Sequence, residues 1–190
     1  VFVTGSTGIA ACHVNGTTLH SFSGIGLGKE DVPSLVQRIR TNRPASKRWQ
    51  DCRALVIDEV SMLDGELFDK LEAIARELLD SREPFGGLQL VLCGDFFQLP
   101  PVTRGNERPV FLFQSRSWHA IAPRCIVLRQ VFRQSEHAFI SLLNQMRKGS
   151  LTPANIRLLQ DLATEGRRTE ALALAASASA SASASASASA

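Results

Sequence analysis

The chain has 190 residues, of which 44% are hydrophobic and 21% are charged, and its formal net charge is +3. This length and composition are typical of one globular domain, and so small a charge does not by itself indicate a nucleic-acid-binding protein. No apolar run approaches the roughly 20 residues of a membrane-spanning helix, and no signal peptide is recognisable. The four cysteines include no C-x-x-C pair, which disfavours zinc and disulfide frameworks and favours reduced thiols.

The two ends of the sequence differ from its middle. Val1 to Thr4 has the composition of a strand already under way, so we expect further protein upstream. Ser177 to Ala190 is a strict alternation of alanine and serine. Such low-complexity sequence cannot offset the entropy lost on ordering, and we predict that it is disordered. We therefore expect a partial domain at residues 1–168 and a tail at 169–190.

Apolar runs typical of strands alternate along the chain with segments of helical periodicity. The expected strands are 1–4, 54–57, 88–93 and 125–128. The expected helices are 6–14, 32–39, 63–78, 139–146 and a last one that begins at Thr152-Pro153. Continuous apolar strands are typical of parallel sheets that are buried on both faces, and the alternation indicates an α/β fold. Ligands bind beyond the carboxyl ends of such strands, so the residues that follow each strand are the functional candidates.

Two acidic residues, Asp58 and Glu59, follow the predicted strand at 54–57. An apolar run followed by two acids is the Walker B pattern of nucleoside triphosphatases. In that pattern the first acid holds the Mg²⁺ that bridges the β- and γ-phosphates. The second acid orients and polarises the attacking water. We therefore predict that Asp58 is a metal ligand and Glu59 a catalytic residue. The alternative is an acid pair that begins a helix before Ser61.

A loop with the sequence Gly-Asp-Phe-Phe-Gln-Leu-Pro-Pro-Val follows the predicted strand at 88–93. The amide of Gln98 in this loop can hydrogen-bond both a γ-phosphate oxygen and the attacking water. Two prolines stiffen the loop. We predict that Gln98 is a catalytic and nucleotide-binding residue.

Arg133, in Val-Phe-Arg-Gln, is a further catalytic and nucleotide-binding candidate. An arginine can stabilise the charge that develops on a transferring phosphoryl group. The alternative for a single arginine is an ordinary surface salt bridge, which contributes little to stability.

Two glycine-containing turns invite comparison with phosphate-binding loops. The turn at Ser6 and Thr7 exposes backbone N–H groups that could bind nucleotide phosphate or a DNA backbone, although it could also be an ordinary capped turn. Residues 24–29, Gly-Ile-Gly-Leu-Gly-Lys, fail the G-x-x-x-x-G-K-[ST] pattern. The spacing is one residue short, Glu30 replaces the hydroxyl residue, and no strand precedes the glycines. We interpret this segment as a flexible, glycine-rich connecting loop.

Five segments occur together in an order that resembles the petite-integration-frequency DNA helicases. These superfamily-one enzymes are related to RecD and move 5′ to 3′ on single-stranded DNA. The segments are TGSTGIAA at 4–11, GTTLHSF at 16–22, DEVSML at 58–63, GDFFQLPPV at 94–102 and VFRQ at 131–134. The resemblance covers most of residues 1–163.

The resemblance implies a RecA-like P-loop NTPase motor domain, with a mostly parallel sheet flanked by helices and incomplete at its N-terminus. It implies that Asp58 coordinates Mg²⁺, that Glu59 activates water, and that Gln98 and Arg133 contact the γ-phosphate of ATP. The family's lysine-bearing phosphate loop would lie upstream of Val1, about 30 residues earlier.

The resemblance also implies a DNA site formed by Ser6, Thr7, Thr18 and His20. Hydroxyl, amide and imidazole groups suit sequence-independent contacts to the DNA backbone. Two aromatic residues are weaker candidates for base stacking, and we expect core packing as the role of both, Phe22 and Phe97.

As a whole, the family resemblance implies an ATP-dependent DNA helicase that uses Mg²⁺ with ATP. The implied partners are single-stranded DNA and forked or structured DNA, the implied state is a monomer, and the implied processes are DNA repair, recombination and telomere maintenance. The implied location is the nucleus or mitochondrion in a eukaryote, and the cytoplasm otherwise. Since the phosphate loop and second motor domain are not among these residues, we expect no ATP hydrolysis by this chain alone. The alternative is a truncated module that binds DNA or a partner without hydrolysing ATP.

Overall fold

The computed structural model describes residues 1–103, 108–121 and 124–166. The chain divides into two compact units, Val1–Val127 and Leu128–Ala190, and each is described by itself. The predicted domain end at 168 and the predicted tail at 169–190 lie outside the described residues. Within the described ranges, no helix has both the length and the apolar content to span a bilayer.

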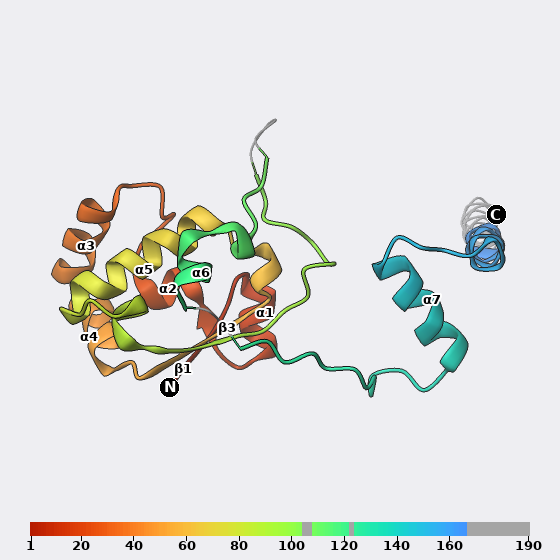
Figure 1. Ribbon diagram of the computed structural model, residues 1–190, viewed down its shortest axis with the longest axis horizontal. Coiled ribbons are helices and arrows are strands. Elements are labelled where there is room, and N and C mark those ends of the chain that lie inside the picture. The colour runs from red at the N-terminus through yellow and green to blue at the C-terminus, as the bar shows by residue number, and fades with distance from the viewer. Residues whose placement is uncertain (104–107, 122–123, 167–190) are drawn as a thin grey trace, which may run out of the picture. The chain divides into compact units, whose positions relative to one another are not determined.

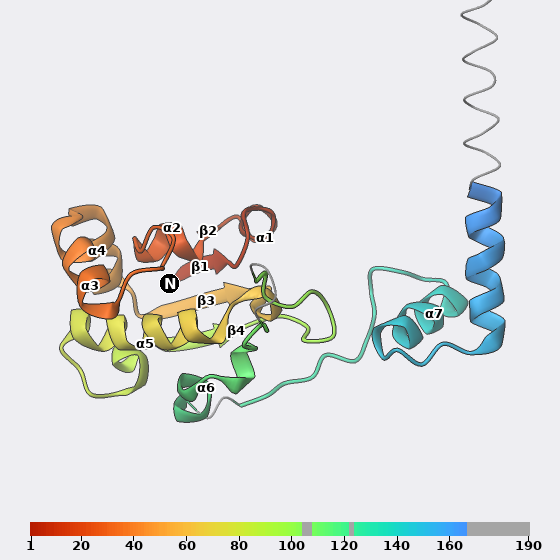
Figure 2. The same ribbon diagram turned by 90° about the horizontal axis from the view of Figure 1, so that it is seen from above.

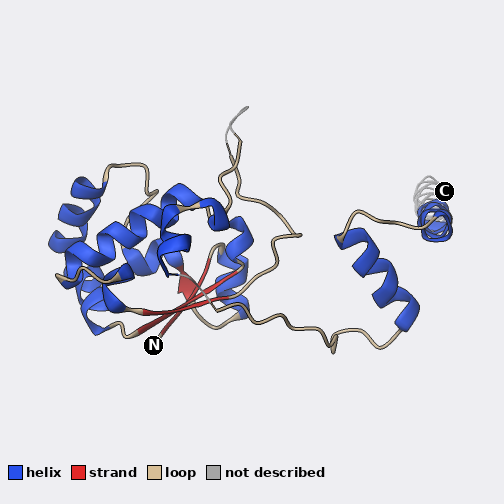
Figure 3. Cartoon of the chain, viewed as in Figure 1, coloured by secondary structure: helices blue, strands red, loops and turns tan. Residues whose placement is uncertain are grey.

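A four-stranded parallel sheet forms the centre of the first unit (Figure 1; Figure 3). Its order is β2-β1-β3-β4, and every pair is parallel. The strands are β1 (Phe2–Gly5), β2 (Thr17–Thr18), β3 (Ala54–Asp58) and β4 (Gln89–Leu92). The three longer strands confirm the predicted strands at 1–4, 54–57 and 88–93. β2 was not predicted, because two residues carry no periodic signal.

Helices connect and flank these strands. The α-helices of the first unit are α1 (Gly8–His13), α2 (Leu19–Ser23), α3 (Val32–Thr41), α4 (Arg43–Asp51), α5 (Gly65–Leu79) and α6 (Arg116–Ile121). Its 3₁₀ turns are η1 (Val60–Met62), η2 (Pro84–Gly87) and η3 (Leu112–Gln114). α1, α3 and α5 confirm predicted helices, and together with the parallel sheet they confirm the α/β fold class.

An aromatic stack packs α2 and α4 against the sheet. The Phe22 ring lies 5.1 Å from Phe2 and 5.2 Å from Trp49, and it is fully buried, which confirms its expected place in the core. The Trp49 indole donates to Ser23 O at 3.0 Å. α4 was not predicted because only Ala45 and Trp49 of its residues are buried, too few for a visible apolar stripe.

The predicted strand at 125–128 is wrong. These residues form no strand in the structure, and the side chains of Ile126, Val127 and Leu128 are 80%, 71% and 90% exposed. A β-strand needs a neighbour for its backbone N–H and C=O groups. Among the described residues this segment pairs with none of the four strands, so its apolar composition alone does not produce a strand.

The second unit contains two helices in its described part. α7 spans His137–Arg147, and residues 153–166 form the other helix. Both confirm predicted helices. The Thr152 hydroxyl accepts the Asn155 N–H at 3.3 Å, so the Thr-Pro pair begins the second helix as its sequence indicated.

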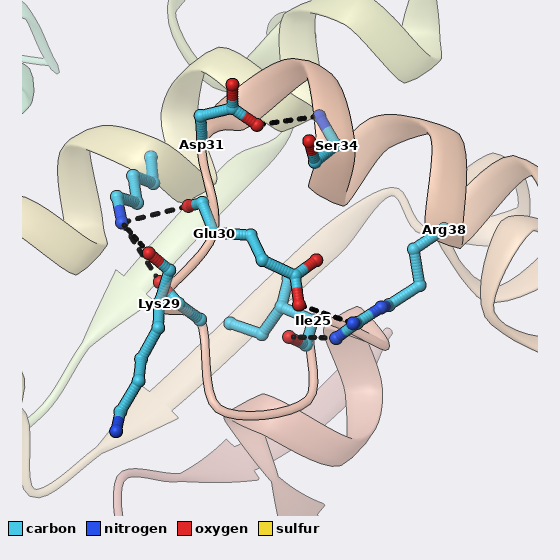
Figure 4. A network of polar contacts seen from close by, with 8 residues as sticks. Ile25, Lys29, Glu30, Asp31, Ser34 and Arg38 are labelled. Carbon is cyan, nitrogen blue, oxygen red and sulfur yellow. Dashed lines mark hydrogen bonds and ion pairs between the residues drawn. The ribbon is translucent and has the colours of Figure 1, made fainter.

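The glycine-rich segment at 24–29 is a braced connecting loop (Figure 4). The Lys70 ammonium donates to the carbonyl oxygens of Gly28, Lys29 and Glu30 at 3.0, 3.5 and 3.0 Å. Arg38 donates to Ile25 O at 3.3 Å and forms an ion pair with Glu30. Carbonyl oxygens converge here on a cation, which is the opposite polarity to a loop whose N–H groups bind phosphate. The interpretation as a connection is confirmed.

We expect Lys70→Met to destabilise the first unit by about 1–3 kcal/mol, because three carbonyl oxygens lose a charged donor. Urea unfolding followed by tryptophan fluorescence measures the change. Lys29→Met is the matched control, since the Lys29 side chain is exposed on the same loop and only its backbone is used. Equal midpoints for Lys70→Met and the unsubstituted protein would show that the brace contributes nothing.

Candidate functional site

The strand register places candidate residues from three strands on one row of the sheet. Gly5 is paired with Thr18 of β2 on one side and with Asp58 of β3 on the other. Because the strands are parallel, this row is the carboxyl end of all three (Figure 2). Adjacent strands lie about 4.8 Å apart, so the backbones of Thr18 and Asp58 are separated by roughly 10 Å.

The turn after β1 is hydrogen-bonded directly to the acid pair. Ser6 N donates to Asp58 O at 3.1 Å, and Ser6 Oγ donates to Glu59 O at 2.9 Å. From the other side, Cys93 N donates to Ile57 O at 2.9 Å, and Cys93 O accepts Val60 N at 3.0 Å. The backbone of the acid pair is therefore held from both neighbouring strands.

Glu59 adopts a left-handed backbone conformation, with φ 55° and ψ 47°. For a residue with a Cβ this conformation costs about 1–2 kcal/mol. It ends β3 and begins the 3₁₀ turn η1, so the acid pair does precede a short helical turn, as the alternative interpretation held. However, no side chain caps that turn, and a capping role therefore does not account for either carboxylate.

Asp58 and Glu59 are half-buried residues. In the part of the chain that the structure describes, no hydrogen bond or ion pair engages either carboxylate. Partial burial and the negative charge of Asp58 together raise the pKa of the Cys93 thiol. Cys93 therefore stays protonated at neutral pH, and none of the cysteines in the described ranges forms a disulfide.

A carboxylate oxygen in this position suits Mg²⁺. No three His, Cys, Asp or Glu side chains cluster into a cation site among the described residues. Mg²⁺ does not need such a cluster, because it is commonly held by one or two carboxylates and takes its remaining ligands from phosphate and water. Asp58, at the strand end, could supply the hard oxygen ligand that this mode requires.

The loop after β4 holds Gln98 in a turn that begins at Asp95. Gln98 N donates to Asp95 O at 2.9 Å, and the Gln98 amide nitrogen donates to Asp95 Oδ2 at 3.3 Å. Phe96 anchors the loop through edge contacts with Phe113 at 5.0 Å and Trp118 at 6.0 Å. Asp95 was not predicted, although aspartate at the start of a tight turn is a recognised signal.

The side chain of Phe97 is 67% exposed. The expectation that Phe97 packs in the core is therefore wrong. Its neighbour Phe96 takes the inward position, because consecutive side chains of a loop cannot both face the same aromatic cluster.

The DNA candidates occupy the turns at the β1 and β2 ends. The Thr7 hydroxyl accepts Ala10 N at 3.2 Å, and the Thr18 hydroxyl accepts Ser21 N at 3.2 Å. Both threonines are thus helix caps, as the alternative for the turn at Ser6 and Thr7 held, but each hydroxyl keeps its own proton to donate. Partial burial lowers the pKa of the His20 imidazole, so this ring is neutral at neutral pH.

Arg133 lies in the second unit, on an exposed segment without helix or strand. Its predicted contact with the γ-phosphate stays a prediction. The first unit thus brings together the turns that carry Ser6, Thr18 and Asp58 at one edge, with the Gln98 loop following the adjacent strand.

The first unit is an α/β domain with a parallel sheet flanked by helices, and the acid pair and the glutamine loop follow its adjacent strands β3 and β4. The family model of the PIF1-like helicases matches residues 1–157, and the chain belongs to this family.

Curated relatives are ATP-dependent DNA helicases. The chain is 53% identical over 164 residues to ATP-dependent DNA helicase PIF1 of Emericella nidulans, covering 86% of this chain and 22% of the relative. It is 49% identical over 162 residues to the Homo sapiens protein of the same name, covering 85% and 25%. The chain thus spans about a quarter of the length of these relatives.

Solved structures of Pif1 helicases share the fold. The Candida albicans Pif1 helicase matches with a TM-score of 0.78 and 46% identity, over 82% of this chain and 36% of that chain. A Bacteroides Pif1 helicase in complex with ADP-AlF3 and single-stranded DNA matches with a TM-score of 0.71 and 32% identity, over 85% and 39%.

We expect Gly94→Ala to destabilise the first unit by about 1–3 kcal/mol, because overpacking forces the backbone to move. A Cβ at Gly94 would lie 2.9 Å from Val60 N and 3.0 Å from Val60 Cγ2, directly behind the acid pair. Gly8→Ala is the control, since a Cβ there meets nothing within 4 Å. Equal thermal midpoints for the two variants would contradict this prediction.

Proposed function

We propose that this chain is the part of an ATP-dependent DNA helicase motor that activates water and contacts the DNA strand. The observation that carries the proposal is the single row of Thr18, Gly5 and Asp58 across three parallel strands. This row places the backbones of Thr18, a candidate DNA-binding residue, and Asp58, a candidate metal ligand, roughly 10 Å apart on one sheet. The family supports the same assignment, since its curated members are ATP-dependent DNA helicases.

At the acid pair, Asp58 holds the Mg²⁺ that accompanies ATP, and Glu59 orients and polarises the attacking water. The metal, when bound, neutralises charge on the β- and γ-phosphates. The supporting observation is that both residues are half-buried at a strand end and that neither carboxylate makes a hydrogen bond or ion pair within the described ranges. Partial burial strengthens electrostatic interactions relative to open solvent.

Gln98 and Arg133 contact the γ-phosphate in this proposal. The Gln98 amide is held by Asp95 across a tight turn. The Gln98 amide can leave the Asp95 carboxylate and donate to a phosphate oxygen instead, because both acceptors are anionic. Gln98 is therefore suited to respond to the presence of the γ-phosphate. Arg133 would supply positive charge to the transition state.

Thr7, Thr18 and His20 contact the DNA backbone in this proposal. The two threonine hydroxyls retain a proton that a phosphate oxygen can accept. A neutral His20 ring donates through one nitrogen without a charge, which suits sequence-independent contact. Ser6 differs from these residues, because its hydroxyl proton is donated to Glu59 O. A Bacteroides relative has been solved with single-stranded DNA bound, which supports a DNA strand as the partner.

In the full-length protein we expect Glu59→Gln to lower the DNA-stimulated ATPase rate by roughly 100- to 10,000-fold, the contribution of a general base. The amide has nearly the same shape but cannot accept a proton. Phosphate release with saturating oligothymidylate measures the rate. Glu66→Gln, an exposed carboxylate on α5, is the matched control and should hydrolyse ATP normally. A normal DNA-stimulated ATPase rate in the Glu59→Gln protein would contradict the proposed function.

We expect the isolated 190-residue chain to hydrolyse ATP negligibly. Its sequence contains no G-x-x-x-x-G-K-[ST] segment, and the chemistry uses the lysine of that segment to hold the β- and γ-phosphates. The measurement is phosphate release by the purified chain with Mg²⁺-ATP and single-stranded DNA. DNA-stimulated turnover that disappears in Glu59→Gln would contradict this expectation.

A further inference from the structure

Ser6 is the side-chain link between the turn that follows β1 and the acid pair on β3. Its backbone N–H and its hydroxyl donate to consecutive carbonyl oxygens, Asp58 O at 3.1 Å and Glu59 O at 2.9 Å. Because Ser6 hydrogen-bonds to two successive carbonyl oxygens, it fixes both the position and the direction of the Glu59 carbonyl. Among the described residues, Ser6 contributes the one side chain that hydrogen-bonds to Glu59.

The backbone of Glu59 needs such a restraint. Its φ of 55° lies in the left-handed region, which residues with a Cβ adopt at a cost. Such a conformation persists only when the surroundings fix it. Glu59 O also accepts Met62 N at 3.2 Å, a local turn bond, and Cys93 O holds the next residue through Val60 N. The Ser6 hydroxyl is the restraint that comes from the β1 side.

The hydroxyl of Ser6 has one proton to donate. A DNA phosphate offers only acceptor oxygens, so Ser6 cannot donate to a phosphate while it donates to Glu59 O. Thr7, the next residue, faces no such conflict, because its hydroxyl accepts Ala10 N and keeps its proton. Side-chain donation to DNA and restraint of Glu59 are therefore divided between two adjacent residues.

We propose that Ser6 is a positioning residue for hydrolysis, which holds the left-handed backbone of Glu59 and so aims its carboxylate. This inference rests on the proposed water-activating role of Glu59. The adjacency of Ser6 and Thr7 gives it a consequence: a DNA strand that binds Thr7 and moves this turn moves the Ser6 hydroxyl, and with it the Glu59 carbonyl. DNA binding at Thr7 is then linked to ATP hydrolysis at Glu59 through the adjacent Ser6 and its hydrogen bond to Glu59 O.

The test measures the full-length protein and separates the rate from DNA affinity. Ser6→Ala is expected to lower the kcat of DNA-stimulated hydrolysis by about 10- to 100-fold, the size of effect that a small misplacement produces. The oligothymidylate concentration for half-maximal stimulation should not change. Ser6→Thr, which keeps the hydroxyl, should restore kcat. Thr7→Ala should instead raise the half-maximal DNA concentration.

Thr4→Val is the matched structural control. The Thr4 hydroxyl also donates from β1 to a β3 carbonyl, Val56 O at 2.8 Å, but two residues before the acid pair. It should keep a normal kcat even if its thermal midpoint falls. Should Ser6→Ala yield too little folded protein, Ser6→Cys keeps the volume with a weakly donating thiol and should also show a reduced kcat.

Four results would overturn the inference. If Ser6→Ala raises the half-maximal DNA concentration and leaves kcat unchanged, Ser6 is a phosphate contact. If Ser6→Ala and Thr4→Val lower kcat equally, the effect is general damage to the strand pair. If Ser6→Thr does not recover the rate, the hydroxyl is not the cause. Activity of Glu59→Gln tests the proposed function separately, since an inactive Glu59→Gln with a fully active Ser6→Ala overturns the Ser6 inference alone.

Discussion

The parallel pairing of β1 with β3 sets the position of the Ser6 turn relative to the acid pair at the edge of the first unit. Gly5 opposite Asp58 brings the turn that begins at Ser6 directly over the acid pair. A slip of one residue in this pairing would turn alternate side chains to the other face of the sheet and would separate Ser6 from Glu59. The register is protected by burial, because Leu55 and Ile57 of β3 are almost completely inaccessible to solvent.

Hydrogen bonds from helices α4 and α5 hold the neighbouring elements of the first unit in place. α4 fixes the end of α2 through Arg48, which donates to Phe22 O at 2.8 Å and to Ser21 O at 2.7 Å, and through the Trp49 indole. α2 begins at Thr18, so this bracing positions the turn that the proposal assigns to DNA. Helix α5 similarly holds α6, since the Asp69 carboxylate accepts Ser117 N at 2.8 Å. Burial alone would raise the pKa of Asp69, but the hydrogen bonds from Ser117 and Arg116 lower it.

Whether a loop presents hydrogen-bond donors or carbonyl acceptors indicates its role better than its glycine content does. Residues 24–29 are rich in glycine, yet their carbonyl oxygens converge on Lys70, and the segment connects α2 to α3. The turn at Ser6 contains fewer glycines. The Ser6 hydroxyl donates to Glu59 O, and the Thr7 hydroxyl accepts Ala10 N and keeps its own proton to donate.

By itself, the sequence determined the α/β class, the three longer strands, the helices with clear apolar stripes and the place of the acid pair at the end of a strand. These features depend on local periodicity and on residues adjacent in the chain. Only the tertiary structure decided that 125–128 is not a strand, that β2 pairs beside β1, and that Phe97 is exposed while Phe96 is the anchor. It alone showed that the Ser6 hydroxyl donates to Glu59 O, because that bond joins residues 53 positions apart and leaves no periodic trace in the sequence.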